Sequence, residues 1–173
     1  MKKIFYLFIL IIFTTNVKAK NIVYLDIQYI IDNSDIGKFY KLKIKDLQTE
    51  NKEKLKSKEK IISNKEIEIN NQKNILSKDE IEKKVQELND LIKEYQKSRS
   101  ELNKNIIENK KKFTAEILKL INPLLTSFVD KQGITLVVDK KNILVGIKSL
   151  DITKDILKIL NNETKKNKLL NEN

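Results

Sequence analysis

The side chains in this sequence that could do chemistry are mostly lysines and carboxylates, and they are concentrated in one segment. Residues 38–112 hold 21 Lys or Arg against 14 Asp or Glu, a net charge of +7. Clustered ammonium groups attract acidic partners over long range, which is a binding chemistry rather than a catalytic one. A charge run on a helix is usually only its solvated face. Confinement of the excess charge to one segment favours a role in attracting a partner.

Catalysis finds little support in the residue types. The chain has no His and no Cys, so the commonest proton-transfer groups, nucleophiles and metal ligands are missing. It also has no glycine-rich phosphate loop and no spaced carboxylate cluster. We therefore expect no enzyme activity, no cofactor and no metal site. The net charge of +11 would also suit nucleic-acid binding, but the export signal described next argues against a specific nucleic-acid partner.

Residues 1–19 have the pattern of a secretory signal peptide. Two lysines precede an apolar run of ten residues, and small residues stand at the −3 and −1 positions of a cleavage site after Ala19. An uncleaved anchor is the alternative, but the run falls well short of the roughly 20 residues that span a bilayer. We expect cleavage after Ala19 and a periplasmic location. Without cysteines, the mature chain would need a helical seam or oligomerisation for stability.

Residues 38–112 are predicted to form two long helices. No glycine occurs between Gly37 and Gly133, and such sparse punctuation indicates helix. Apolar residues recur at coiled-coil spacing in both halves. They are Leu55, Ile62, Ile69 and Leu76 in the first half and Ile81, Val85, Leu88, Ile92, Tyr95, Leu102, Ile106 and Phe113 in the second, where Arg99 and Asn109 are polar members of the same pattern. The first half has only one regular apolar position per heptad, so we expect the outer part of the pair to bend and fray easily.

The two helices are expected to reverse direction near residues 74–80. Ser77 followed by Glu80 is a capping box, which satisfies the first free amide groups of a new helix. The sequence therefore predicts an antiparallel helical hairpin with arms about 60 Å long. One continuous helix of about 130 Å is the competing interpretation.

The two ends of the mature chain, residues 20–37 and 113–161, are predicted to form a small body. The expected strands lie near 22–27, 134–138 and 143–147, the last two as a β-hairpin. The expected fold class is α+β and mostly α: a small β body for oligomerisation plus a long antiparallel helical hairpin.

Three further features concern the helices of this body. Pro123 is expected to kink the second long helix or to restart it with Asn122 as cap. Asp151 would cap a short amphipathic helix. Residues 162–173 are expected to be a polar tail.

Several motifs together resemble the Skp/OmpH family of periplasmic chaperones. They are the signal peptide, the strand IVYLDIQ, the segment SDIGK, the lysine-rich hairpin, GITLVVD and SLDITKDILKILN. The resemblance runs in order from Asn21 to Asn161, and its specific parts are the two ends.

The resemblance implies a homotrimer in which strands and base helices from three chains form a shared body. Three hairpins would surround a cavity that holds unfolded outer-membrane β-barrel proteins and prevents their aggregation without ATP. The residues that it implies for the oligomerisation body are Val23, Leu25, Leu136, Val138, Leu144 and Ile147. Client contacts would be distributed over the arm 38–112, which could also be attracted to an anionic lipid or membrane surface. An exported coiled-coil structural or tethering protein of the cell envelope is the alternative.

Overall fold

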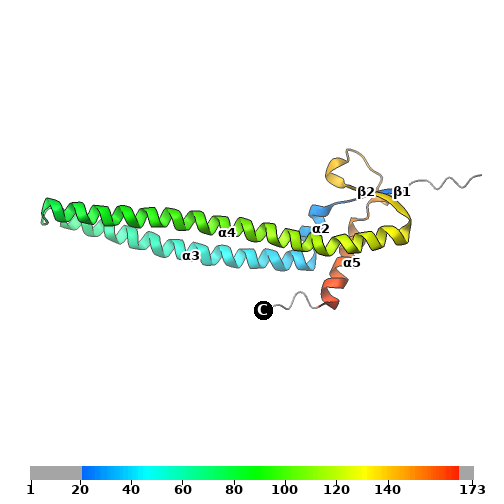
Figure 1. Ribbon diagram of the computed structural model, residues 1–173, viewed down its shortest axis with the longest axis horizontal. Helices are drawn as coiled ribbons and strands as arrows, with labels where there is room; N and C mark the ends of the chain where they lie inside the picture. Colours follow the sequence, from blue (N-terminus) through cyan, green and yellow to red (C-terminus); the bar gives the residue numbers. More distant parts are fainter. Residues whose placement is uncertain (1–20, 168–173) are drawn as a thin grey trace, which may run out of the picture.

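Two long helices lie side by side and project from a small body of mixed structure (Figure 1). The computed structural model describes residues 21–167, so the expected signal peptide, residues 1–19, lies outside the described residues. The elements in chain order are β1 (Asn21–Leu25), α2 (Ile27–Asn33), α3 (Asp35–Gln72), α4 (Lys78–Gln132), β2 (Ile134–Asp139), the short 3-10 turns η1 (Lys140–Asn142) and η2 (Lys148–Leu150), and α5 (Thr153–Lys166). The expected fold class, mostly α with a small β body and a long antiparallel hairpin, is confirmed.

Serine residues begin both long helices. The Oγ atom of Ser34 accepts a hydrogen bond from the Gly37 amide at 3.1 Å and so caps α3. Ser77 forms with Glu80 the full capping box that the sequence predicts, and α4 starts there. Gly133 ends α4 with a φ of 62°, a conformation that glycine adopts without steric cost. The chain turns over residues 73–77, so α3 and α4 run antiparallel and a single continuous helix is not formed.

The two strands pair with each other in parallel, which corrects the expected hairpin. The register places Val23 opposite Val137 and Leu25 opposite Asp139. Residues 143–147 form no strand. Parallel strands need a long crossover connection, and here the whole helical hairpin supplies it. The segment after β2 instead turns through η1, where the Asp139 carboxylate accepts a hydrogen bond from the Lys141 amide at 3.2 Å.

Two aspartates end extended segments and begin helices. The carboxylate of Asp26 accepts a hydrogen bond from the Tyr29 amide at 2.8 Å, so β1 stops at residue 25 rather than 27 and α2 begins. The carboxylate of Asp151 accepts from the Thr153 amide at 3.0 Å. Asp151 therefore serves the first turn of α5 as expected, although Ile152 occupies the formal cap position.

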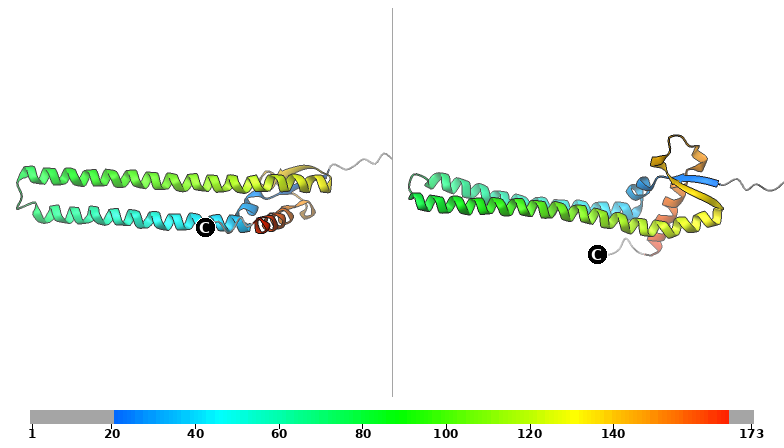
Figure 2. Two further views of the ribbon diagram at one scale, coloured as in Figure 1. Left: turned by 60° about the horizontal axis from the view of Figure 1, so that its bottom comes forward. Right: turned by 45° about the horizontal axis from the view of Figure 1, so that its top comes forward.

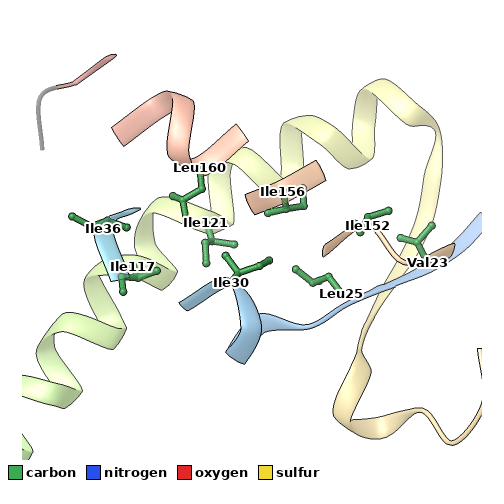
Figure 3. Packing of buried hydrophobic residues seen from close by; sticks show 9 residues of the cluster. All are labelled: Val23, Leu25, Ile30, Ile36, Ile117, Ile121, Ile152, Ile156 and Leu160. Carbon is green, nitrogen blue, oxygen red and sulfur yellow. The ribbon is translucent and has the colours of Figure 1, made fainter. Parts of the chain in front are cut away.

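The hydrophobic core lies where both long helices meet the rest of the body. Figure 3 shows side chains from β1, α2, α3, α4 and α5 converging on one cluster. Its buried members are Val23, Leu25, Ile30, Ile36, Ile117, Ile121, Ile152, Ile156 and Leu160. Helix α5 packs across the base of α4, which explains why the apolar patch there is wider than a two-helix seam requires. Each fully buried aliphatic side chain contributes about 1.5–3 kcal/mol to folding.

Helix α5 is longer than the sequence predicts. The expected polar tail is wrong over residues 162–166, which continue the helix to Lys166. The carboxylate of Asp35 lies 3.2 Å from Lys165 Nζ. The backbone amide of Asp35 donates a hydrogen bond to Asn161 Oδ1 at 2.9 Å. Thr164 is buried, and its hydroxyl donates to the Asn161 carbonyl. Polar side chains that resemble a tail in the sequence therefore hold the end of α5 against the start of α3.

Pro123 lies inside α4 and does not restart it. Proline removes one backbone hydrogen bond from a helix, and α4 changes direction towards its C-terminal end (Figure 2). Nearby, the Thr126 hydroxyl donates to the Asn122 carbonyl at 3.0 Å. The expected restart at Asn122 is therefore wrong, and α4 passes from arm to body as one helix.

We predict that Gly37→Ala destabilises the body strongly. A Cβ atom at this position would lie 1.7 Å from the Ile31 backbone carbonyl oxygen, so α2 and α3 would have to separate. The free energy of unfolding, measured by urea titration followed by circular dichroism, should fall by about 1–3 kcal/mol or more.

Gly133→Ala is the matched control for this substitution. Its added Cβ atom meets no other atom within 4 Å, so only the left-handed backbone is unfavourable, at about 1–2 kcal/mol. A loss at Gly37 no larger than the loss at Gly133 would contradict the close approach of α2 and α3.

Candidate functional site

The surface between and around α3 and α4 is the candidate site, because it carries most of the excess charge. The predicted apolar positions of α3, such as Leu55 and Ile62, are half-buried against α4. On α4 the predicted positions Val85 and Arg99 are exposed, and Lys84 and Ser98 are half-buried instead. The observed seam of α4 therefore departs by one residue at these places from the predicted pattern.

Polar residues alternate with the apolar ones along the α3 seam. Asn51, Lys58, Lys65 and Gln72 recur every seven residues, each between two apolar seam positions. Three ion pairs join the two helices along this stretch, and two of them use lysines of the series. They join Lys58 to Glu94 at 2.5 Å, Lys65 to Glu87 at 2.8 Å, and Lys84 to Glu68 at 2.5 Å. Exposed ion pairs contribute little net stability, so the arm is held less firmly than an all-apolar coiled coil.

The two amides of this polar series are imperfectly paired. Asn51 is only 4% exposed, its Nδ2 lies 3.5 Å from the Leu102 carbonyl, and its Oδ1 has no hydrogen-bond partner among residues 21–167. The Oε1 atom of Gln72 is also buried and has no hydrogen-bond partner among residues 21–167. A polar residue at a seam position fixes the register of the helices at a cost in stability. Asn51 and Gln72 therefore help to align the two helices but contribute little to holding them together.

The cross-arm pairs shift the pKa values of their members. Hydrogen bonds from lysines lower the pKa of three carboxyl groups, those of Glu68, Glu87 and Glu94. The hydrogen bond to Glu87 raises the pKa of Lys65. The Tyr95 hydroxyl donates to Glu59 at 2.5 Å, and this bond raises the pKa of Tyr95. Tyr95 therefore takes part in cross-arm packing rather than standing free for a partner.

Large apolar side chains are exposed among the charges of the arm. Sequence periodicity does not single out this set, apart from Val85, because most of its members lie off the seam. It consists of Leu42, Ile61, Ile67, Ile75, Val85 and Ile107. Within residues 21–167, no helix is both long and apolar enough to cross a membrane. No group of carboxylates there is arranged to hold a metal ion.

The residues predicted for the oligomerisation body fall into two groups. Val23 and Leu25 are buried in the core of their own chain, and Val138 is half-buried. Leu136 and Ile147 are 51% and 66% exposed, and Leu144 is fully exposed. Ile22 and Val145 lie next to Val23 and Leu144 in the sequence and are also exposed, but they were not among the residues predicted for the oligomerisation body. Ile22 pairs with Leu136 across the sheet, a parallel contact that local sequence patterns do not reveal.

The sequence matches a known protein family, and a solved structure has a similar fold. The family model described as outer membrane protein (OmpH-like) matches residues 21–160. A solved structure of a candidate outer membrane chaperone (OmpH-like) from Caulobacter crescentus is similar, with a TM-score of 0.77 and 14% sequence identity. The similarity covers 87% of this chain and 89% of that one. No curated protein matches the sequence.

We predict that acid loosens the arm. A depressed carboxyl pKa contributes stability that is complete above the unfolded value of about 4.3 and is lost as pH falls through the folded value. The raised pKa of Lys65 acts at the other end of the pH range, where its contribution is lost as pH rises through the folded value. Because the chain has no cysteine, spin labels can be placed at Ser57→Cys and Ser98→Cys, which line one groove between the helices. The distance distribution between the labels should broaden when pH falls from 7 to below about 4.

The triple variant Glu68→Gln, Glu87→Gln, Glu94→Gln is the control. It should show a broad distribution at pH 7 and little further change in acid. A wild-type distribution that stays narrow throughout would show that the ion pairs do not hold the arm together.

Proposed function

The chain belongs to the OmpH-like family of outer membrane proteins, and from this membership we propose that it is an ATP-independent holdase chaperone of the periplasm. Its clients are unfolded outer-membrane β-barrel proteins, which it holds between helical arms and protects from aggregation. The observation that carries the proposal is the surface of the arm, where exposed lysines and exposed apolar side chains are interspersed.

This surface suits a client without fixed structure. Unfolded barrel chains present carboxylates together with apolar side chains, and a basic surface attracts the former while exposed isoleucines contact the latter. Each contact is weak, but contacts made by several arms on one client add by avidity. Preferential binding of the unfolded state needs no nucleotide, because binding itself shifts the equilibrium.

We place the contacts between subunits on the exposed apolar side of the body. Leu136, Leu144 and Ile147 are exposed within residues 21–167, and exposed apolar groups of this kind indicate an interaction surface. Val23 and Leu25 would support that surface from inside the core rather than touch a second chain. The assembly is proposed to be a homotrimer, with the arms free to surround a cavity.

The attraction of the arm extends to a second kind of surface. The excess of lysines would also draw it to an anionic lipid headgroup layer, where each lysine contributes about 1 kcal/mol near the surface. This contact would bring a loaded chaperone close to the membrane that its clients enter.

Light scattering of the purified mature protein, alone and with a urea-unfolded outer-membrane barrel, tests the function. We expect a trimeric species that takes up one barrel, and turbidity that stays low because the client is enclosed. The experiment is run without nucleotide. A barrel that precipitates at its unassisted rate would contradict the holdase function and favour an envelope tether.

We predict that Leu144→Asp with Ile147→Asp dissociates the assembly. Charges introduced at a buried subunit contact would be desolvated without partners, so the mass should fall to that of one chain. Both side chains are exposed within the single chain, so helicity should be retained.

Ile75→Asp is the matched control for this pair. Ile75 is similarly exposed but lies in the turn between the arms, and the trimer should persist. Loss of the trimer in both variants would contradict an assembly surface on the body.

A further inference from the structure

A groove of about 760 Å³ lies at the base of the arm, where α2, α3 and α4 meet. We call it the basal groove. Its apolar lining includes Ile31, Leu42, Phe113 and Ile117. Leu42 is 60% exposed, so it offers apolar surface that residues 21–167 do not cover. A groove of this volume is in the range of those that take a small ligand or a few side chains.

One wall of the basal groove is held in place by its neighbours. The rings of Tyr40 and Phe113 stack with centroids 4.2 Å apart and planes within 4° of parallel. The Tyr40 hydroxyl donates to Glu116 at 2.6 Å. A ring fixed in this way loses little conformational freedom when a partner packs against it.

The basal groove is strongly basic. Lys38, Lys41, Lys45 and Lys110 line it, against the single carboxylate of Asp32. None of these four ammonium groups forms an ion pair with a carboxylate of residues 21–167. Three of the lysines follow one another at intervals of three and four residues along one face of α3.

Grooves farther along the arm have a different charge. One that includes Lys65 is lined by four carboxylates, those of Glu68, Glu87, Asp90 and Glu94. Another is balanced, with two lysines and two glutamates. Lys58 and Lys65, which line these grooves, already form ion pairs with glutamates of α4. The basal groove therefore combines uncompensated positive charge with uncovered apolar surface.

We propose that the basal groove is an anchoring site for client segments in which carboxylates and apolar side chains occur together. The lysines complement the carboxylates, while Leu42 and the stacked ring of Phe113 receive the apolar side chains. This proposal rests on the chaperone function, and it replaces a uniformly distributed arm contact with one preferred position. A segment anchored there would leave the remainder of the client to be held loosely by the outer arm.

Fluorescence anisotropy with short labelled peptides tests the anchoring site on the full mature protein. The first peptide alternates apolar residues with glutamate, and the second has glutamine in place of glutamate. The first should bind more tightly, and its affinity should fall with added salt because the attraction is electrostatic. The variant Lys41→Glu, Lys45→Glu, Lys110→Glu should weaken its binding by about tenfold or more, and Leu42→Ser alone should weaken both peptides.

The matched control reverses three other exposed lysines of the arm, as Lys60→Glu, Lys83→Glu, Lys111→Glu. It makes the same change in net charge outside the basal groove and should alter the affinity by less than about twofold. An equal loss in the control would overturn the proposal, because the charge would then act without regard to position. Circular dichroism verifies folding, and the corresponding Lys→Gln variants repeat the comparison if the glutamate set loses helicity.

Two further measurements separate this proposal from its rivals. Binding to anionic lipid vesicles without binding to the acidic apolar peptide would overturn the proposal in favour of a lipid surface. The turbidity of an unfolded barrel is followed with the wild type and both triple variants. Protection by the wild type together with identical behaviour of the two variants would overturn the anchoring site and leave the chaperone function standing. Failure of the wild type to protect would reject the chaperone function itself.

Discussion

The parallel pairing of β1 with β2 is the contact on which the rest of the structure depends. It brings together the two ends of the segment that forms the hairpin, so both long helices leave the body at the same place. The backbone amide of Ile152 donates to the Tyr24 carbonyl, and the Asp26 amide donates to the Thr153 hydroxyl. Closing so long a loop is entropically unfavourable. The isoleucine-rich core beneath β1 offsets this cost, and the arm can then extend without a core of its own.

Body and arm are stabilised by different interactions, which gives them different mechanical properties. In the body, aliphatic side chains are removed from water, and their contribution does not require charged carboxylates. Along α3, polar residues alternate with the apolar seam residues, and one of them, Lys65, is ion-paired with Glu87. Regions with few buried apolar contacts open at lower free energy than the core. The arm can therefore change shape around a partner while the body keeps both helices anchored.

Local signals in the sequence predicted the features that local interactions produce. The reversal follows from the capping box of Ser77 and Glu80, and the long helices follow from the absence of glycine and from heptad spacing. The pairing of strands was predicted wrongly, because β2 joins a strand at the far end of the chain rather than the apolar residues that follow it. The basal groove was not foreseen for the same reason. Its lining residues Ile31, Leu42 and Phe113 lie on three different helices, and Phe113 is distant in sequence from the other two.

The pairing of the lysines decides where a basic arm attracts a partner. Net charge alone would make the whole of residues 38–112 equally attractive, but the cross-arm glutamates neutralise the ammonium groups of Lys58, Lys65 and Lys84. The basal lysines Lys38, Lys41, Lys45 and Lys110 form no ion pair within residues 21–167, and they lie beside apolar surface. An acidic unfolded segment therefore gains most by binding at the base, where the helices are also held most firmly. The loosely joined outer arm then has the freedom to follow whatever shape the rest of the partner takes.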